Sequence, residues 1–168
     1  KLFISILSLF SIVSATDVSG VISSNTTWIA LSSPYIVTGN VLVSEGVTLT
    51  IEAGVEVKFD SDKSLQINGE LIAMGTDGNK ITFTSNQSSP AAGDWAYISF
   101  ASNSVNATFD AEGNYLSGCI LEYCTIKYGN TGISITSSPF VNYCDINSNS
   151  GNGISINGSP KVSNNAVN

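Results

Sequence analysis

The stretch Gly132-Ile133-Ser134-Ile135-Thr136-Ser137-Ser138-Pro139 decides the fold, because a close copy follows about 21 residues later as Gly153-Ile154-Ser155-Ile156-Asn157-Gly158-Ser159-Pro160. Just upstream, Tyr123-Cys124-Thr125-Ile126 returns about 20 residues later as Tyr143-Cys144-Asp145-Ile146. A fixed period of this length is typical of a solenoid, in which each unit buries its apolar face against its neighbours. The units hold short alternating pieces between Gly, Asn, Ser and Pro, so each unit reads as one turn of a β-helix.

A shorter interval governs the N-terminal half of the chain. Apolar pairs recur there about every 16 residues, as Leu49/Ile51, Leu65/Ile67, Ile81/Phe83 and Ile98/Phe100. We expect successive pairs to lie on consecutive turns and to form an apolar ladder inside the coil. Evenly spaced glycines separate the alternating runs, and we expect each to supply a positive φ at a corner: Gly39, Gly54 and Gly69.

Together the two intervals predict an all-β fold, a single-stranded right-handed parallel β-helix. Its turns are expected to lengthen from about 16 to about 21 residues along the chain.

Composition agrees with short strands and tight turns. The 168 residues are 42% hydrophobic and only 11% charged, and much of the remainder is Ser, Thr, Asn and Gly. This mixture disfavours helices and is too apolar for a disordered chain. The net charge is −7, with neither Arg nor His in the sequence. Nucleic acid and anionic membrane surfaces both attract basic proteins, so we expect neither as a partner.

The two ends of the chain give the expected domain boundaries. Residue Lys1, an apolar run to Val13 and a small residue at Ala15 are typical of a signal peptide over residues 1–15. We therefore expect a secreted or cell-surface protein without membrane insertion after cleavage. Residues 16–33 are expected to enter or cap the coil, and residues 34–168 to form the β-helix. The repeat pattern runs to Asn168 without a polar cap, so we expect further β-helix turns or an anchor domain beyond it.

Three segments carry a resemblance to a known family. They are Val47-Thr48-Leu49-Thr50-Ile51-Glu52-Ala53-Gly54-Val55, Leu65-Gln66-Ile67-Asn68-Gly69-Glu70-Leu71 and Ile81-Thr82-Phe83-Thr84-Ser85. They resemble the opening of secreted right-handed parallel β-helix repeat proteins of the pectate-lyase-like superfamily. The resemblance implies the fold for residues 34–168. It leaves the activity open, because the superfamily includes polysaccharide lyases, glycoside hydrolases, adhesins and surface proteins.

The sequence favours a protein without enzymatic activity. The resemblance implies an Arg or Lys base beside acidic Ca²⁺ ligands in a lyase, and clustered Asp with a His in a hydrolase. Arg, His and an Asp-Asp pair are all absent from the sequence. Asp60-Ser61-Asp62 is explained more simply as a turn, and we assign no catalytic or metal-binding residue. A Ca²⁺ site remains a minor alternative, as does a lyase or hydrolase whose catalytic residues lie beyond Asn168.

A pair of tyrosines is the best candidate for a binding site. If Cys124 points inward, Tyr123 points outward, and Tyr143 lies beside it on the next turn about 5 Å away. Such a flat aromatic platform suits a sugar ring. The surrounding residues expected to contact its hydroxyl groups are Glu122, Lys127, Asn142 and Asp145.

We therefore expect an adhesive or structural role with a polysaccharide or cell-surface glycan as ligand. The alternatives are an inert surface stalk and tyrosines that only stabilise the sheet.

The three cysteines, Cys119, Cys124 and Cys144, are too few for a disulfide framework. Cys124 and Cys144 occupy equivalent places in successive turns, where their side chains point in parallel. We therefore expect two buried thiols in an apolar ladder rather than a disulfide.

Overall fold

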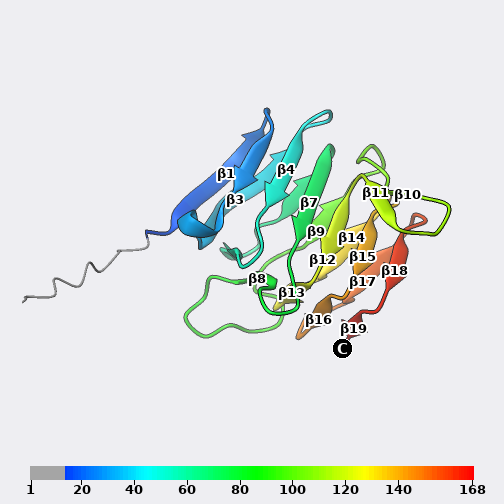
Figure 1. Cartoon of the computed structure of the whole chain (residues 1–168). Helices are drawn as coiled ribbons and strands as arrows, with labels where there is room; N and C mark the ends of the chain where they lie inside the picture. Colours follow the sequence, from blue (N-terminus) through cyan, green and yellow to red (C-terminus); the bar gives the residue numbers. More distant parts are fainter. Residues whose placement is uncertain (1–13) are drawn as a thin grey trace, which may run out of the picture.

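The computed structural model describes residues 14–168; the segment 1–13, which holds most of the expected signal peptide, lies outside the described residues. Within residues 14–168 the chain forms nineteen β-strands and one short 3-10 helix, η1 (Ala30–Ser32). Figure 1 shows the strands stacked side by side along one axis, with the chain advancing from β1 (Thr16–Ile22) at one end to β19 (Ala166–Val167) at the other. No helix among the described residues has the length and hydrophobicity needed to cross a bilayer.

The strands line three faces of a coil, and the chain visits the faces in a fixed order. Face 1 is the six-stranded sheet of β2 (Thr26–Trp28), β4 (Thr48–Ile51), β7 (Glu70–Met74), β12 (Ile120–Glu122), β15 (Phe140–Asn142) and β18 (Lys161–Ser163). The second sheet bends at β3 (Tyr35–Val43), whose two halves pair with different strands.

The first half of β3 belongs to face 2, with β5 (Glu56–Phe59), β8 (Ile81–Ser85), β13 (Cys124–Lys127), β16 (Asp145–Asn147) and β19. Its second half belongs to face 3, with β6 (Leu65–Ile67), β9 (Ile98–Phe100), β14 (Ile133–Ile135) and β17 (Ile154–Ile156). Every pairing between turns is parallel, and the coil makes about seven turns of about 22 residues. The predicted parallel β-helix is confirmed.

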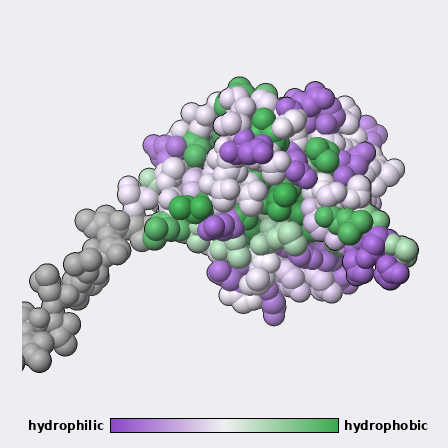
Figure 2. All heavy atoms as spheres, turned by 45° about the horizontal axis from the view of Figure 1, so that its top comes forward, coloured by the Kyte–Doolittle hydropathy of each residue, from purple (hydrophilic) through white to green (hydrophobic). Residues whose placement is uncertain are grey.

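Apolar rows running along the axis fill the coil. On face 2 the backbone register stacks Val57, Phe83, Ile126 and Ile146 over four turns, and all four side chains are fully buried. Face 3 stacks Ile133 directly on Ile154, as the repeat predicted. Outward positions between the buried ones are mostly polar, which is the expected alternation of a strand with one face in the core. Figure 2 accordingly shows hydrophobic groups interrupted by polar residues on the surface in view.

The ladder predicted from the shorter interval is wrong. Leu49 lies in β4 on face 1, Leu65 in β6 on face 3 and Ile81 in β8 on face 2, so these residues belong to three different rows. All three are buried, but the steps from Leu49 to Leu65 and from Leu65 to Ile81 each cover two sides of a three-sided turn rather than a whole turn. Of the predicted pairs, only Leu65/Ile67 and Ile98/Phe100 share a row. The observed partners one turn apart, Tyr35 with Val57 and Val57 with Phe83, are separated by longer stretches of sequence.

The expected lengthening of the turns along the chain is also wrong, for the same reason. Thr125 pairs with Asp145 after about 20 residues, so the C-terminal turns are no longer than the N-terminal ones. The three evenly spaced glycines likewise lie at different corners. Only Gly54 has a positive φ, of 83°. A side chain at Gly69 would instead overlap the carbonyl oxygens of Ser44 and Val47, so this glycine is required by close backbone approach.

Residues 16–33 form the first described turn of the coil. β1 pairs in parallel with both halves of β3, and β2 pairs with β4. The strands of this segment therefore stack in parallel on the next turn, as the strands of the later turns do.

The polar insertion after β9 folds back onto face 1. It forms an antiparallel hairpin of β10 (Thr108–Phe109) and β11 (Tyr115–Ser117). Phe109 and Tyr115 lie against the outward ring of Phe140, with centroid distances of 5.2 and 6.3 Å. The ammonium of Lys161 lies 4.3 Å from the Phe109 ring centre and donates a hydrogen bond to the Gly113 carbonyl oxygen. A small apolar layer thus covers part of the outer surface of face 1.

The inner rows should carry most of the stability. Leu121 in β12 is fully buried, whereas Leu116 in β11 is 62% exposed. We predict that Leu121→Ala lowers the free energy of unfolding by about 2–5 kcal/mol, because it leaves a cavity in the core. The matched variant Leu116→Ala is expected to stay within about 0.5 kcal/mol of the parent. Denaturant unfolding followed by tryptophan fluorescence measures both, and equal losses would contradict the three-sided register.

Candidate functional site

The edge where face 1 meets face 2 has the same unusual backbone on three consecutive turns. Tyr123, Tyr143 and Asn164 link the strands there, and their φ angles are 48°, 50° and 56°. A positive φ is uncommon for residues other than glycine and disfavours a bulky side chain such as tyrosine. The sharp corner points each of these side chains away from the coil. We call this edge, defined by Tyr123, Tyr143 and Asn164, the tyrosine corner.

The two tyrosine rings stack on one another. Their centroids are 4.9 Å apart and their planes differ by 6°. The separation agrees with the expected spacing between turns. Each ring covers one face of the other, so a ligand meets the ring edges, the hydroxyl groups and the outer face of Tyr143. Tyr143 is 44% exposed and is the more accessible of the pair.

A projecting turn bounds the pair on its N-terminal side. Residues 75–80 occupy the same edge one turn earlier, where the chain needs six residues instead of one. The amide of Gly75 donates to the Glu122 carbonyl oxygen at 2.8 Å, and the amide of Ile81 donates to that of Tyr123 at 3.2 Å. A side chain at Gly75 would press against the Tyr123 carbonyl oxygen. Residues 75–80 therefore lie next to Tyr123 on the N-terminal side of the stack. Asn164 lies next to Tyr143 on the C-terminal side.

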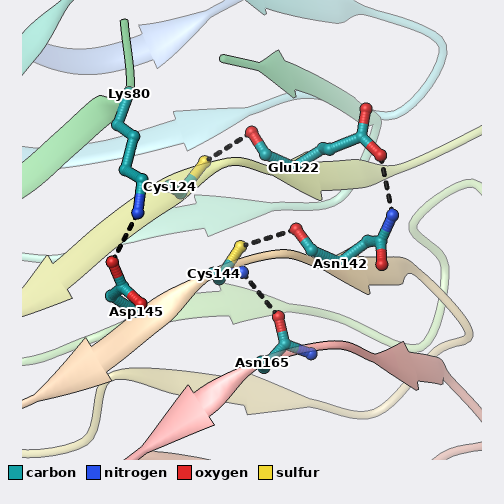
Figure 3. A network of polar contacts seen from close by, with 7 residues as sticks. All are labelled: Lys80, Glu122, Cys124, Asn142, Cys144, Asp145 and Asn165. Carbon is teal, nitrogen blue, oxygen red and sulfur yellow. Dashed lines mark hydrogen bonds and ion pairs between the residues drawn. The ribbon is translucent and has the colours of Figure 1, made fainter. Parts of the chain in front are cut away.

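A row of hydrogen-bonded side chains flanks the corner on face 1. The Asn142 amide donates to Glu122 Oε1 at 2.7 Å, and the Asn164 amide donates to Asn142 Oδ1 at 3.0 Å. Figure 3 shows the Glu122 and Asn142 side chains pointing the same way from neighbouring strands. Asn142 is only 6% exposed, so it offers little surface to a ligand, and its hydrogen bond orients Glu122. Side-chain ladders of this kind also stabilise the stacking of turns.

An ion pair flanks the corner on face 2. Lys80, at the end of the projecting turn, lies 2.6 Å from Asp145 Oδ2 in β16 (Figure 3). The hydrogen bond to Asp145 raises the pKa of the Lys80 ammonium above its ordinary value, and the Asp145 and Asp77 charges act in the same direction. Sequence reasoning missed Lys80, because 65 residues separate it from Asp145. The pairing of Ile81 with Cys124 places Lys80 at the same corner as Tyr123, one turn earlier, and Asp145 lies on the turn after Tyr123.

Five of the six predicted site residues lie at or beside the corner: Tyr123, Tyr143, Glu122, Asn142 and Asp145. The sixth, Lys127, lies at the other end of β13, where its ammonium is 5.5 Å from the ring centre of Tyr128. Asp60, in the segment assigned above to a turn, accepts a hydrogen bond from Asn86. Residues 14–168 contain no group of three or more Cys, Asp or Glu side chains placed to hold a metal ion.

Two cysteines lie directly behind the corner. The Cys124 thiol donates to the Glu122 carbonyl oxygen, and the Cys144 thiol donates to that of Asn142 (Figure 3). The Cys144 amide donates to Asn165 Oδ1 at 2.7 Å. All three cysteines of the chain are free and buried, which confirms the prediction of buried thiols for Cys124 and Cys144. Burial raises the pKa of Cys119 to about 11 and that of Cys124 well above its ordinary value.

The corner thus combines an exposed aromatic stack with hydrogen-bonding groups on both flanks. This combination is typical of sites that bind a polar ring by one face and its hydroxyl groups by their edges.

Comparison with known proteins agrees with the architecture. The model of the pectate-lyase like beta helix domain matches residues 20–159. The chain belongs to this family of pectate-lyase-like β-helix domains. Family and solenoid together support a surface or structural β-helix protein.

A relative shares part of the sequence. Protein bark beetle from Drosophila melanogaster is 43% identical over 53 residues, which cover 32% of this chain and 2% of that protein. The match therefore spans only a small part of the relative's length. No solved structure matches the chain.

The ion pair at the corner gives a pH-dependent prediction. A raised folded-state pKa of Lys80 stabilises the fold below its ordinary value of 10.5, and this contribution disappears as the pH rises through the folded-state pKa. Lys80→Gln should lower the free energy of unfolding by less than about 1 kcal/mol at neutral pH, because the pair is partly exposed. Variant and parent should converge at higher pH.

Lys63→Gln is the control, because it removes the same charge from a lysine outside the two ion pairs of the described chain. Thermal unfolding at several pH values measures both variants. A loss for Lys80→Gln that persists above the folded-state pKa would contradict the electrostatic origin.

The buried thiols give a chemical prediction. In the native protein at about pH 8, none of the three should react with a disulfide reagent on the time scale on which the unfolded chain reacts completely, because all three are buried and inaccessible. The absorbance of the released thiolate gives the number of thiols that have reacted. If an early reaction is seen in the parent and is missing in Cys144→Ala, Cys144 is the thiol that reacts. Rapid reaction of Cys124 or Cys144 in the native state would show that the corner opens.

Proposed function

We propose that this β-helix is an adhesive or structural module that binds carbohydrate at the tyrosine corner. The observation that carries the proposal is the parallel stack of Tyr123 and Tyr143 at 4.9 Å on an exposed edge. An aromatic ring offers the apolar face of a sugar a contact surface at a low cost in side-chain entropy. Since the stack is held rigidly by the coil, little ordering is needed when a ligand binds.

The flanks supply the polar contacts that a sugar requires. Glu122 is held by Asn142 on one side, and Asp145 by Lys80 on the other. Carboxylate and amide groups accept and donate the hydrogen bonds that orient hydroxyl groups. The turns also place equivalent groups about 4.8 Å apart along the axis, so a glycan chain lying along the edge meets similar contacts on successive turns.

The proposal places the protein outside the cell or on its surface. The apolar run from Leu2 to Val13 followed by Ala15 supports this placement. The family is named for pectate lyase, which agrees with a carbohydrate ligand. No metal or cofactor takes part in the proposed binding.

A glycan array with the parent protein tests the proposal, followed by titration of the best ligand. We expect Tyr143→Ala to weaken binding by roughly five- to thirtyfold, which corresponds to about 1–2 kcal/mol of lost ring contact. Tyr143→Phe keeps the ring and should retain most of the affinity. The matched control is Tyr97→Ala, because Tyr97 is 41% exposed and precedes β9 on face 3.

Two results would contradict the proposal. Binding that survives both Tyr123→Ala and Tyr143→Ala would place the ligand elsewhere on the coil. An absence of binding to every glycan would leave the tyrosines as a structural ladder and favour an inert stalk.

A further inference from the structure

The charges around the tyrosine corner are unbalanced. Glu122 lies on its face 1 flank, Asp145 on its face 2 flank, and Asp77 in the projecting turn that bounds Tyr123. Against these three carboxylates stands one ammonium, that of Lys80, and Asp145 already pairs with it. The chain as a whole carries a net charge of −7 and has no arginine. A ligand approaching the stack therefore meets a negative potential.

Two carboxylate oxygens at the corner remain available. Within residues 14–168, Glu122 accepts its side-chain hydrogen bond at Oε1 from Asn142, and Oε2 accepts none. Asp145 uses Oδ2 for Lys80, and its Oδ1 accepts none. Because Asn142 fixes the Glu122 side chain, the free oxygen is held in place beside the stack. A fixed carboxylate oxygen is a good acceptor for an ammonium or hydroxyl donor.

We infer that the tyrosine corner selects sugars without carboxylate groups, and that amino sugars bind there more tightly than neutral ones. This inference rests on the proposed carbohydrate binding at the same corner. A uronate would bring its negative charge toward Glu122, Asp145 and Asp77, which costs free energy at short range. The strongest contacts to a carboxylate come from an arginine fork or an unpaired lysine ammonium. Lys127 lies over Tyr128, away from the corner.

The family's name alone would suggest an acidic polysaccharide as the ligand rather than an amino sugar. Pectate is a polyuronate, so a site that binds it needs positive charge, either from basic side chains or from a Ca²⁺ ion held by acidic ones. Residues 14–168 contain no group of three or more acidic side chains placed to hold such an ion. The corner instead offers a surplus of carboxylates, and the unmatched charge therefore favours an ammonium-bearing chain.

Matched oligosaccharides separate these possibilities. Glucosamine and N-acetylglucosamine oligomers of equal length differ in the charge of the amino group, and galacturonate oligomers provide the acidic class. Calorimetric titration of the full chain at about pH 6 should show glucosamine oligomers binding about two- to fivefold more tightly than the acetylated ones, the size typical of an exposed charge pair. Galacturonate oligomers should bind most weakly. About 1 M salt should remove the difference.

Glu122→Gln should abolish the preference for glucosamine over acetylated oligomers. The readout is the ratio of the two affinities, because Glu122 also contacts hydroxyl groups in the proposed function and its replacement weakens the binding of both. The glutamine carbonyl can still accept the hydrogen bond from Asn142, and thermal unfolding checks that the fold is kept. Glu112→Gln makes the same charge change in the exposed loop of the β10–β11 hairpin and should preserve the preference.

The outcomes distinguish the two proposals. Tighter binding of galacturonate oligomers than of acetylated ones overturns the charge selection but leaves carbohydrate binding intact. A glucosamine preference that survives in Glu122→Gln overturns the role of this carboxylate. No binding of any of these three oligomers overturns the selection of amino sugars, whereas the proposed function is overturned only when the glycan array also shows no binding.

Discussion

Everything in this protein depends on strands one turn apart meeting in exact backbone register. A slip of one residue would move each inward side chain to the surface, because neighbouring residues of a strand point to opposite sides. The fully buried row of Val57, Phe83, Ile126 and Ile146 enforces the register on face 2. The same register repeats each surface feature at the next turn. It therefore creates the tyrosine stack, since Tyr123 and Tyr143 hold equivalent places.

The corner differs from the faces in what it demands of the backbone. A single residue with positive φ turns the chain between face 1 and face 2, and tyrosine is a poor choice for that conformation. Asparagine, which tolerates it, occupies the next turn as Asn164. A residue in such a conformation costs roughly 1–3 kcal/mol of stability, and it persists only where surrounding contacts fix it. Here the contacts are the ring stack and the flanking row through Asn142. The strain is consistent with a role of these tyrosines beyond the stability of the coil.

Much of the fold was predictable because the C-terminal turns repeat almost without interruption. Ile133 and Ile154 stack as their sequence spacing indicated. The N-terminal half misled the prediction, because two sides of a triangular turn also produce a regular interval of about 16 residues. Sequence periodicity detects the alternation of each strand but does not state which face the strand joins. The stacked tyrosines were predictable for the same reason as the repeat. Lys80 was not, because its contact with Asp145 depends on a corner of different length in an earlier turn.

Two insertions determine which parts of face 1 and of the tyrosine corner remain accessible. The hairpin of β10 and β11 covers the apolar outer surface of face 1 around Ile120 and Phe140, which are buried although they lie outside the inner core. The shorter turn 75–80 lies against the N-terminal side of Tyr123 and places Lys80 on the face 2 flank, where it pairs with Asp145. Insertions in a solenoid project without disturbing the stacking of turns, because each turn contacts only its neighbours. A regular coil thus acquires an aromatic stack at one edge, with the polarity around it set by residues from separate turns.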